Sequence, residues 1–130
     1  MTDDKRTEKQ KTGAIGESIA EQFLRSKGYK IIEKNYRRKW GEIDIIAEKA
    51  NTVRFIEVKA VSRESRAVHR PEELVDRRKL TKVARTAALY METKRDRREF
   101  QIDVVGVIIM DKASRTAQCR LFEQALESNL

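Results

Sequence analysis

Residues 41–48 read GEIDIIAE and residues 53–60 read VRFIEVKA, and these two stretches decide the fold. Both are rich in isoleucine, valine or phenylalanine, a composition that is typical of buried β-strands. The four residues between them, 49–52, are few enough to join the strands as a hairpin. Both strands also contain acidic residues, and burying a carboxylate is costly unless a partner compensates its charge. The sequence therefore predicts a hairpin whose acidic residues have a partner.

Side chains alternate along a strand, so Glu57 and Lys59 share one face of the second stretch. If Asp44 lies across the hairpin from Glu57, two carboxylates and an ammonium group converge. A divalent ion would relieve the repulsion between the carboxylates, and Mg²⁺, or Mn²⁺ in its place, suits a site completed by water and phosphate oxygens. Lys59 would then hold a nucleophilic water or neutralise charge on a phosphoryl group. From the spacing alone, a half-buried ion pair is an equally weighted interpretation.

The rest of the chain predicts an α/β fold with the element order αβββαβ. Apolar residues at helical spacing predict a first helix at 13–27, and we expect a second helix to begin at Pro71, with Glu72 and Glu73 near its positive end. The remaining expected segments are strands at 29–36, 100–110 and 119–122, a loop at 62–70, a flexible polar tail at 1–12 and a single domain at 13–130.

The composition favours a folded domain with a polyanionic partner. Of the 130 residues, 38% are charged and 39% are apolar, and the formal net charge is +8. Such a chain suits nucleic acid first and an acidic membrane surface second. The sequence has one cysteine, Cys119, no basic-then-apolar leader and no apolar run of membrane-spanning length. We therefore expect a cytoplasmic protein that does not cross a membrane.

Two groups of basic residues are candidates for phosphate contacts. Residues 62–98 hold 12 Lys or Arg against 6 Asp or Glu, and the candidates among them are Arg77, Arg78, Lys79, Lys82 and Arg85. A solvated helix face is the competing interpretation for each. Arg37 and Arg38 precede Trp40, a mixture that suits stacking on an unpaired base, although a Trp40 that covers the core stays open as well.

Two further acids need an interpretation. Glu17 flanks the apolar stripe of the first helix, so it could border the site at the seam between that helix and the sheet. An ordinary solvated glutamate in the first turn is the alternative. Asp103 lies in an apolar strand, which indicates a structural, hydrogen-bonded carboxylate, and we leave it outside the site.

Three stretches together resemble the YraN family of small bacterial proteins: residues 13–60, residues 77–91 (RRKLTKVARTAALYM) and residues 100–107 (FQIDVVGV). That family is assigned to the restriction-endonuclease-like PD-(D/E)XK nucleases and is similar in its core to archaeal Holliday-junction resolvases. The resemblance implies a restriction-endonuclease-like αβββαβ core, in which helices flank a mixed central sheet.

The same resemblance assigns roles to single residues. It implies Glu17 as the helical acid, Asp44 and Glu57 as metal ligands, and Lys59 as the catalytic lysine. Lys79 also matches a lysine of the family pattern. That pattern continues with an arginine two residues after the catalytic lysine, whereas this chain has a valine there.

These observations lead to the hypothesis of a Mg²⁺-dependent endonuclease that hydrolyses phosphodiester bonds of DNA rather than RNA, with branched or flapped DNA as candidate substrates. The main alternative is a nucleic-acid-binding module that keeps the fold without cleavage. A third is a structural interaction protein whose acids are paired with Lys59. A homodimer stays open as the assembly.

Overall fold

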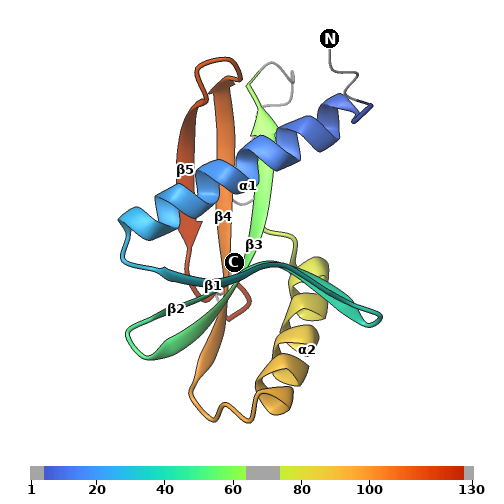
Figure 1. Cartoon of the computed structure of the whole chain (residues 1–130), viewed down its shortest axis with the longest axis vertical. Helices are drawn as coiled ribbons and strands as arrows, with labels where there is room; N and C mark the ends of the chain where they lie inside the picture. Colours follow the sequence, from blue (N-terminus) through green and yellow to red (C-terminus); the bar gives the residue numbers. More distant parts are fainter. Residues whose placement is uncertain (1–4, 64–73, 128–130) are drawn as a thin grey trace.

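The described part of the chain forms a mixed five-stranded sheet and two α-helices (Figure 1). The computed structural model describes residues 5–63 and 74–127. Their elements follow the order α1 (Glu8–Ser26), β1 (Lys30–Arg38), β2 (Gly41–Lys49), β3 (Thr52–Ser62), α2 (Arg77–Thr93), β4 (Phe100–Asp111) and β5 (Thr116–Phe122). The strands are arranged β1-β2-β3-β4-β5, and only β3 and β4 are parallel neighbours. The predicted α/β class and the αβββαβ order are confirmed, and β5 is the additional strand.

The two helices build two separate hydrophobic cores on the sheet. Ala20 and Leu24 of α1 belong to one core with Ile56, while Leu80 of α2 belongs to the other core with Phe55. Adjacent residues of β3 thus face opposite helices, as the alternation of side chains along a strand requires. The parallel step from β3 to β4 is made by a crossover that contains α2.

The first helix begins at Glu8, five residues before the predicted start. Its beginning is fixed by a capping box: the backbone N–H of Gln10 donates to Oγ1 of Thr7, and the backbone N–H of Thr7 donates to Oε1 of Gln10. Residues 8–12, which were assigned to the flexible tail, therefore form the first turns of α1, and Thr12 is buried. A threonine followed three residues later by a glutamine is the signal that could have shown this.

The second helix begins at Arg77, so the predicted start at Pro71 is wrong. Its N-cap is Asp76, whose Oδ1 accepts hydrogen bonds from the backbone N–H groups of Arg78 and Lys79. The first turn of α2 contains no acidic residue. Glu72 and Glu73, together with Pro71 and most of the predicted loop at 62–70, lie outside the described residues.

The hairpin of β2 and β3 is confirmed. Ala50 and Asn51 form its turn with φ angles of 51° and 58°, so both residues adopt the left-handed conformation of a two-residue type I′ turn. The pairing runs from Lys49 opposite Thr52 to Ile45 opposite Ile56. Among the described residues, no helix is both long and apolar enough to cross a membrane.

Candidate active site where two strands separate

The candidate site lies where β2 and β3 move apart. Beyond the pair Ile45 and Ile56, the backbone N–H of Val58 donates a hydrogen bond of 2.8 Å to Oδ2 of Asp44. The carboxylate of Asp44 therefore occupies the place that a backbone carbonyl of β2 would take in a continuous ladder. This hydrogen bond fixes Asp44 beside Glu57, as the hairpin register predicts.

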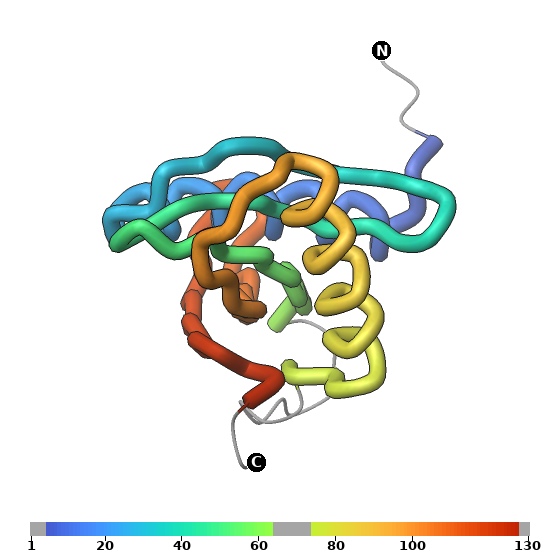
Figure 2. The backbone as a smooth tube through the Cα atoms, turned by 90° about the horizontal axis from the view of Figure 1, so that it is seen from below, coloured from blue at the N-terminus to red at the C-terminus, as the bar shows by residue number. Residues whose placement is uncertain are grey.

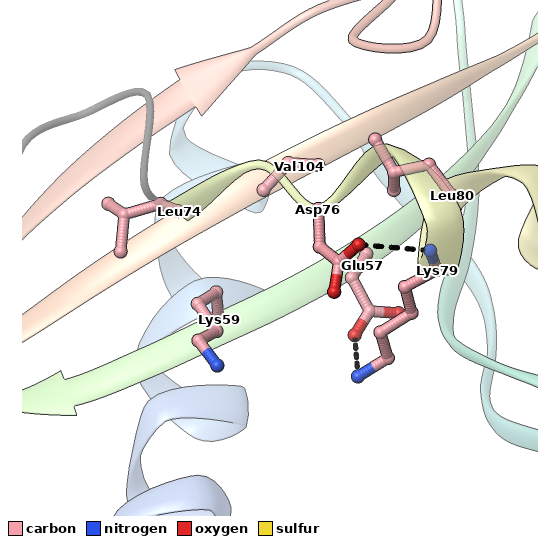
Figure 3. Close-up of a pocket in the computed structure, with 7 residues that line it drawn as sticks. All are labelled: Glu57, Lys59, Leu74, Asp76, Lys79, Leu80 and Val104. Carbon is pink, nitrogen blue, oxygen red and sulfur yellow. Dashed lines mark hydrogen bonds and ion pairs between the residues drawn. The ribbon is translucent and has the colours of Figure 1, made fainter.

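Glu57 is the most buried acid of this site. Its side chain is 9% exposed, and its Oε1 lies 2.6 Å from Nζ of Lys79. Lys79 belongs to the first turn of α2, which the cap by Asp76 holds in place. Figure 3 shows Lys79 reaching Glu57 from the helix, while Lys59 lies farther along the same strand. The ion-pair interpretation supposed that Glu57 is paired with Lys59. In the structure its partner is Lys79 of α2.

The two carboxyl groups influence each other's protonation. Burial raises the pKa of Glu57 to about 7, and the negative charge of Asp44 acts in the same direction. Burial also raises the pKa of Asp44, although the hydrogen bond from Val58 opposes the shift. In the absence of a metal, the pair therefore tends to keep a proton near neutral pH, and Lys79 offsets part of the remaining charge.

Glu17 borders the pair from the side of α1. Its pKa is raised first by burial and then by the negative charge of Asp44, which places Glu17 within electrostatic reach of the site. The preceding residue, Gly16, sets this position: a methyl group there would overlap Cβ of Ala60. The absence of a side chain lets α1 pack closely onto β3 and brings Glu17 near the strand that carries Glu57.

Lys59 is exposed and lines a small pocket of about 110 Å³ together with Glu57 and Lys79. Leu74 and Asp76 contribute to the wall on the side of α2. Leu74 packs against Gly106 of β4, the residue paired with Lys59, and a Cβ at that position would collide with it. The segment before α2 is therefore seated on the sheet directly beside the lysine, and the charged ends of Lys59 and Glu57 point to the same side of β3 (Figure 3).

The donor set allows a cation with few protein ligands. Within the described residues, no group of three or more His, Cys, Asp or Glu side chains is placed to hold a metal ion. Asp44 and Glu57 supply two carboxylates. Mg²⁺ commonly keeps several waters and binds through one or two carboxylates plus phosphate oxygens, so it fits this set better than an ion that needs a complete protein cage.

The basic candidates are distributed over two surfaces. Arg78 and Lys82 are exposed on α2, whereas Nη2 of Arg77 donates to the carbonyl oxygen of Leu126 over 2.9 Å. Arg77 therefore links the start of α2 to Leu126 in the segment after β5. Arg37 and Arg38 lie at the end of β1; the former is ion-paired with Glu42, with Nε and Oε2 3.7 Å apart.

The structure also shows the surroundings of Trp40 and Asp103, two residues outside the acidic pair. Trp40 is 55% exposed, so it does not cover the core. Asp103 is fully buried and accepts hydrogen bonds from the Tyr29 hydroxyl, the Gln101 amide and the backbone N–H of Gln124. Its predicted structural role is confirmed.

Sequence reasoning missed the place of Lys79 in the site. The prediction put it on a phosphate-binding helix face, but its ammonium group contacts Glu57. The sequence signal for this position is Asp76. As the N-cap it starts α2 three residues before Lys79 and so places that lysine in the first turn of the helix, beside the sheet. The spacing of charges along the chain does not contain this information.

Known sequences resemble this chain over most of its length. Residues 16–107 match the model of uncharacterised protein family UPF0102. A UPF0102 protein of Syntrophomonas wolfei is 40% identical over 104 residues, which cover 79% of this chain and 89% of that protein. One of Clostridium botulinum strain Kyoto is 43% identical over 99 residues, covering 75% and 79%, and one of Campylobacter hominis is 39% identical over 97 residues, covering 75% and 83%. The YraN family is UPF0102, so the chain belongs to the family that its sequence resembles.

Proposed function

We propose that the protein is a Mg²⁺-dependent endonuclease that hydrolyses DNA, with Mn²⁺ as a substitute ion. The observation that carries this proposal is the pair of the buried Glu57 and the partly buried Asp44, with Lys59 and Lys79 beside Glu57 in one pocket. Two repelling carboxylates of which one lines a pocket are an arrangement that a bound cation stabilises. The order of Asp44, Glu57 and Lys59 along β2 and β3 also supports kinship with the PD-(D/E)XK nucleases.

The proposed division of labour follows from the contacts of each residue. Asp44 and Glu57 would hold the ion, which when bound supplies an activated water and neutralises charge on the phosphoryl group. The Val58 N–H keeps Asp44 oriented, so little reorganisation is needed there. Lys59, exposed beside the pair, would orient the attacking water or bind a phosphoryl oxygen. Glu17 would tune the charge of the site from α1.

Lys79 would have a second task in this scheme. It neutralises Glu57 in the metal-free protein, and a cation at the carboxylates would take over that function. Its ammonium group is then free to bind a DNA phosphate, in line with Arg78 and Lys82 on the exposed side of α2. The net charge of +8 supports such a polyanionic partner.

A nucleic-acid-binding module without cleavage is the second candidate. It is favoured by the same ion pair of 2.6 Å, because Lys79 compensates Glu57 without any metal. In this case the acids orient the first turn of α2, and the basic residues alone bind the phosphates.

Single-turnover cleavage of labelled DNA separates the two candidates. Wild-type protein is incubated with duplex, branched, flapped and single-stranded DNA and with matched RNA, in Mg²⁺, Mn²⁺ or EDTA. The nuclease proposal expects metal-dependent products that Asp44→Asn and Glu57→Gln abolish, while Glu92→Gln, a carboxylate change at the far end of α2, leaves them unchanged. Binding without products on any of these substrates would favour the non-cleaving module.

A further inference from the structure

The hairpin of β1 and β2 ends in an exposed aromatic surrounded by cations. Arg38 is paired with Gly41, so Lys39 and Trp40 form a two-residue turn. Trp40 is the only tryptophan of the protein and is 55% exposed. Its indole ring is a large apolar surface, and the free energy falls when a partner covers that surface. Figure 2 shows that this turn projects beyond the body of the molecule.

The tip is held firmly although it projects. Gly41 is pressed against α2, since a Cβ at this position would collide with the side chain of Thr86. The guanidinium carbon of Arg38 lies 4.2 Å from the centre of the Tyr36 ring, and that ring packs edge-on against Tyr90 of α2 with centroids 5.2 Å apart. The residues on both sides of the turn are thus anchored, so the backbone that carries Trp40 loses little conformational entropy when a partner binds.

A shallow hollow lies between α1 and β1, the first strand of this hairpin. It has a volume of about 390 Å³, and its walls include Arg6 and Glu17 of the α1 side and Asn35 and Arg37 of β1. Glu17 is the acid that borders Asp44. Trp40 directly precedes β2, and Asp44 lies four residues further along the chain in that strand, about 13 Å away at 3.3 Å per residue, so a short single strand can contact both.

We propose that Trp40 stacks on an unpaired base next to the scissile phosphate, so that the substrate class is DNA with a single-stranded segment at the site. This inference rests on the proposed function for its nucleic-acid partner. Indole stacking tolerates any base, and Lys39 and Arg38 can bind the adjoining phosphates. Bases within a duplex are already stacked on each other and do not offer a free face, so blunt duplex DNA lacks the feature that Trp40 recognises.

The surroundings favour nucleic acid over a lipid surface. Trp40 is the only large apolar side chain of the turn, and membrane-bound surface segments bury a broad apolar face instead. The other exposed large apolar residues among those described, Ile32, Leu89 and Phe100, lie on β1, α2 and β4 and not at this tip.

Fluorescence of the single tryptophan tests the inference without cleavage. Metal-free full-length protein in EDTA is titrated with a short oligothymidine, with a blunt duplex and with phosphatidylglycerol vesicles. We expect saturable quenching of Trp40 by the single strand and little quenching by the duplex. Because the variants lack the tryptophan, their affinities are measured by the fluorescence anisotropy of labelled DNA. We expect Trp40→Ala to weaken single-strand binding about 10-fold or more, Trp40→Phe to retain most of it, and both to leave duplex affinity unchanged.

Leu89→Ala, which removes another exposed apolar side chain, is the matched control and should bind like the wild type. Quenching by vesicles but not by DNA, or equal losses of single-strand and duplex affinity in Trp40→Ala, would overturn the inference. The outcome is distinct from that of the nuclease proposal. Quenching in a protein that never cleaves would sustain the stacking site alone, whereas cleavage of a flapped or single-stranded substrate by Trp40→Ala at the wild-type rate would overturn the inference.

Discussion

At the scale of single residues, the site is governed by the competition for the charge of Glu57. Burial and Asp44 favour its protonated form, while Lys79 favours the carboxylate. A cation that binds Asp44 and Glu57 has to displace a proton or the ammonium group of Lys79. Metal affinity should therefore rise with pH as Glu57 ionises near its pKa of about 7.

The same linkage predicts the stability of Glu57→Gln. The folded-state pKa of about 7 lies above the ordinary pKa of 4.5 for a glutamate, so the folded protein binds more protons than the unfolded chain between these pH values. The contribution of Glu57 to the free energy of unfolding therefore falls as pH rises through this window and is constant above it. Glu57→Gln removes that loss of stability, so we expect the variant to be more stable than the wild type at pH 8 by about 3 kcal/mol and similar to it at pH 4.5.

Urea unfolding in EDTA at the two pH values measures this difference. Glu92→Gln, which removes an exposed carboxylate of α2, serves as the control and should differ from the wild type by no more than about 0.5 kcal/mol. A Glu57→Gln protein that is less stable than the wild type at pH 8 would show that the ion pair with Lys79 outweighs the burial of the charge.

The two lysines of the pocket should have separable effects. Lys59→Ala leaves both carboxylates and the Glu57–Lys79 ion pair in place, so metal binding and DNA affinity should persist while cleavage falls at least about 100-fold. Lys79→Ala leaves Glu57 without its ammonium partner, so the pKa of Glu57 should rise further. The metal affinity at pH 7 should therefore differ from that of the wild type by more in Lys79→Ala than in Lys59→Ala. Calorimetric metal titration and single-turnover kinetics on both variants provide the comparison. Unchanged cleavage in Lys59→Ala would refute its catalytic assignment.

At the scale of elements, three glycines determine how closely the flanking segments approach the sheet. Gly16 brings α1 onto β3, Gly106 accepts Leu74 before α2, and Gly41 accepts Thr86 of α2. Each contact lies within one or two residues of a candidate site residue or of its strand partner. The positions of Glu17, Lys79 and Trp40 consequently depend on backbone contacts that apolar periodicity does not encode.

Two glycines of α1 allow this idea to be tested within one helix. Gly16→Ala introduces a methyl group that collides with Ala60, so we expect a loss of about 1–3 kcal/mol in the free energy of unfolding. Gly13→Ala meets no atom within 4 Å and should stabilise the helix by about 0.5–1 kcal/mol, because alanine is the better helix former. Thermal or urea unfolding of the two variants is the measurement. Stabilisation by both substitutions would mean that α1 can move away from β3 at little cost.

The elements themselves were largely readable from the sequence. Residues 41–48 and 53–60 have the composition of buried strands and form the hairpin, because strand composition and a short connection act locally. The start of α2 was misread because Pro71, followed by two glutamates, has the features of a helix N-terminus. Asp76 provides the cap instead, since its side chain satisfies two backbone N–H groups of the first turn.

At the scale of the whole molecule, the neighbourhood of Asp44 and Glu57 was predictable and the position of Lys79 was not. A hairpin register brings the two acids together from sequence alone. The contact between Lys79 and Glu57 requires the parallel crossover to β4 and the seating of Leu74 on Gly106, which are consequences of the complete fold. Long-range packing also decided that Arg77 binds the carbonyl of Leu126 rather than standing free for a phosphate.

The distribution of charge over the whole molecule gives the last prediction. The double variant Arg78→Glu/Lys82→Glu removes two exposed cations of α2 near Lys79 and spares Arg77, whose contact with Leu126 is structural. If this face binds DNA phosphates, affinity should fall for every sequence, and the slope of log affinity against log salt should become shallower by about 2, because each phosphate contact releases about one counterion. Arg97→Glu/Arg120→Glu makes the same change in net charge on the loop after α2 and on β5, so it separates a located interface from a general effect of charge. Fluorescence anisotropy of a labelled duplex and a labelled single strand over a range of salt concentrations measures both slopes. Equal losses in the two double variants would mean that DNA responds only to the overall charge of the protein, and an unchanged slope in Arg78→Glu/Lys82→Glu would show that this face of α2 is merely solvated.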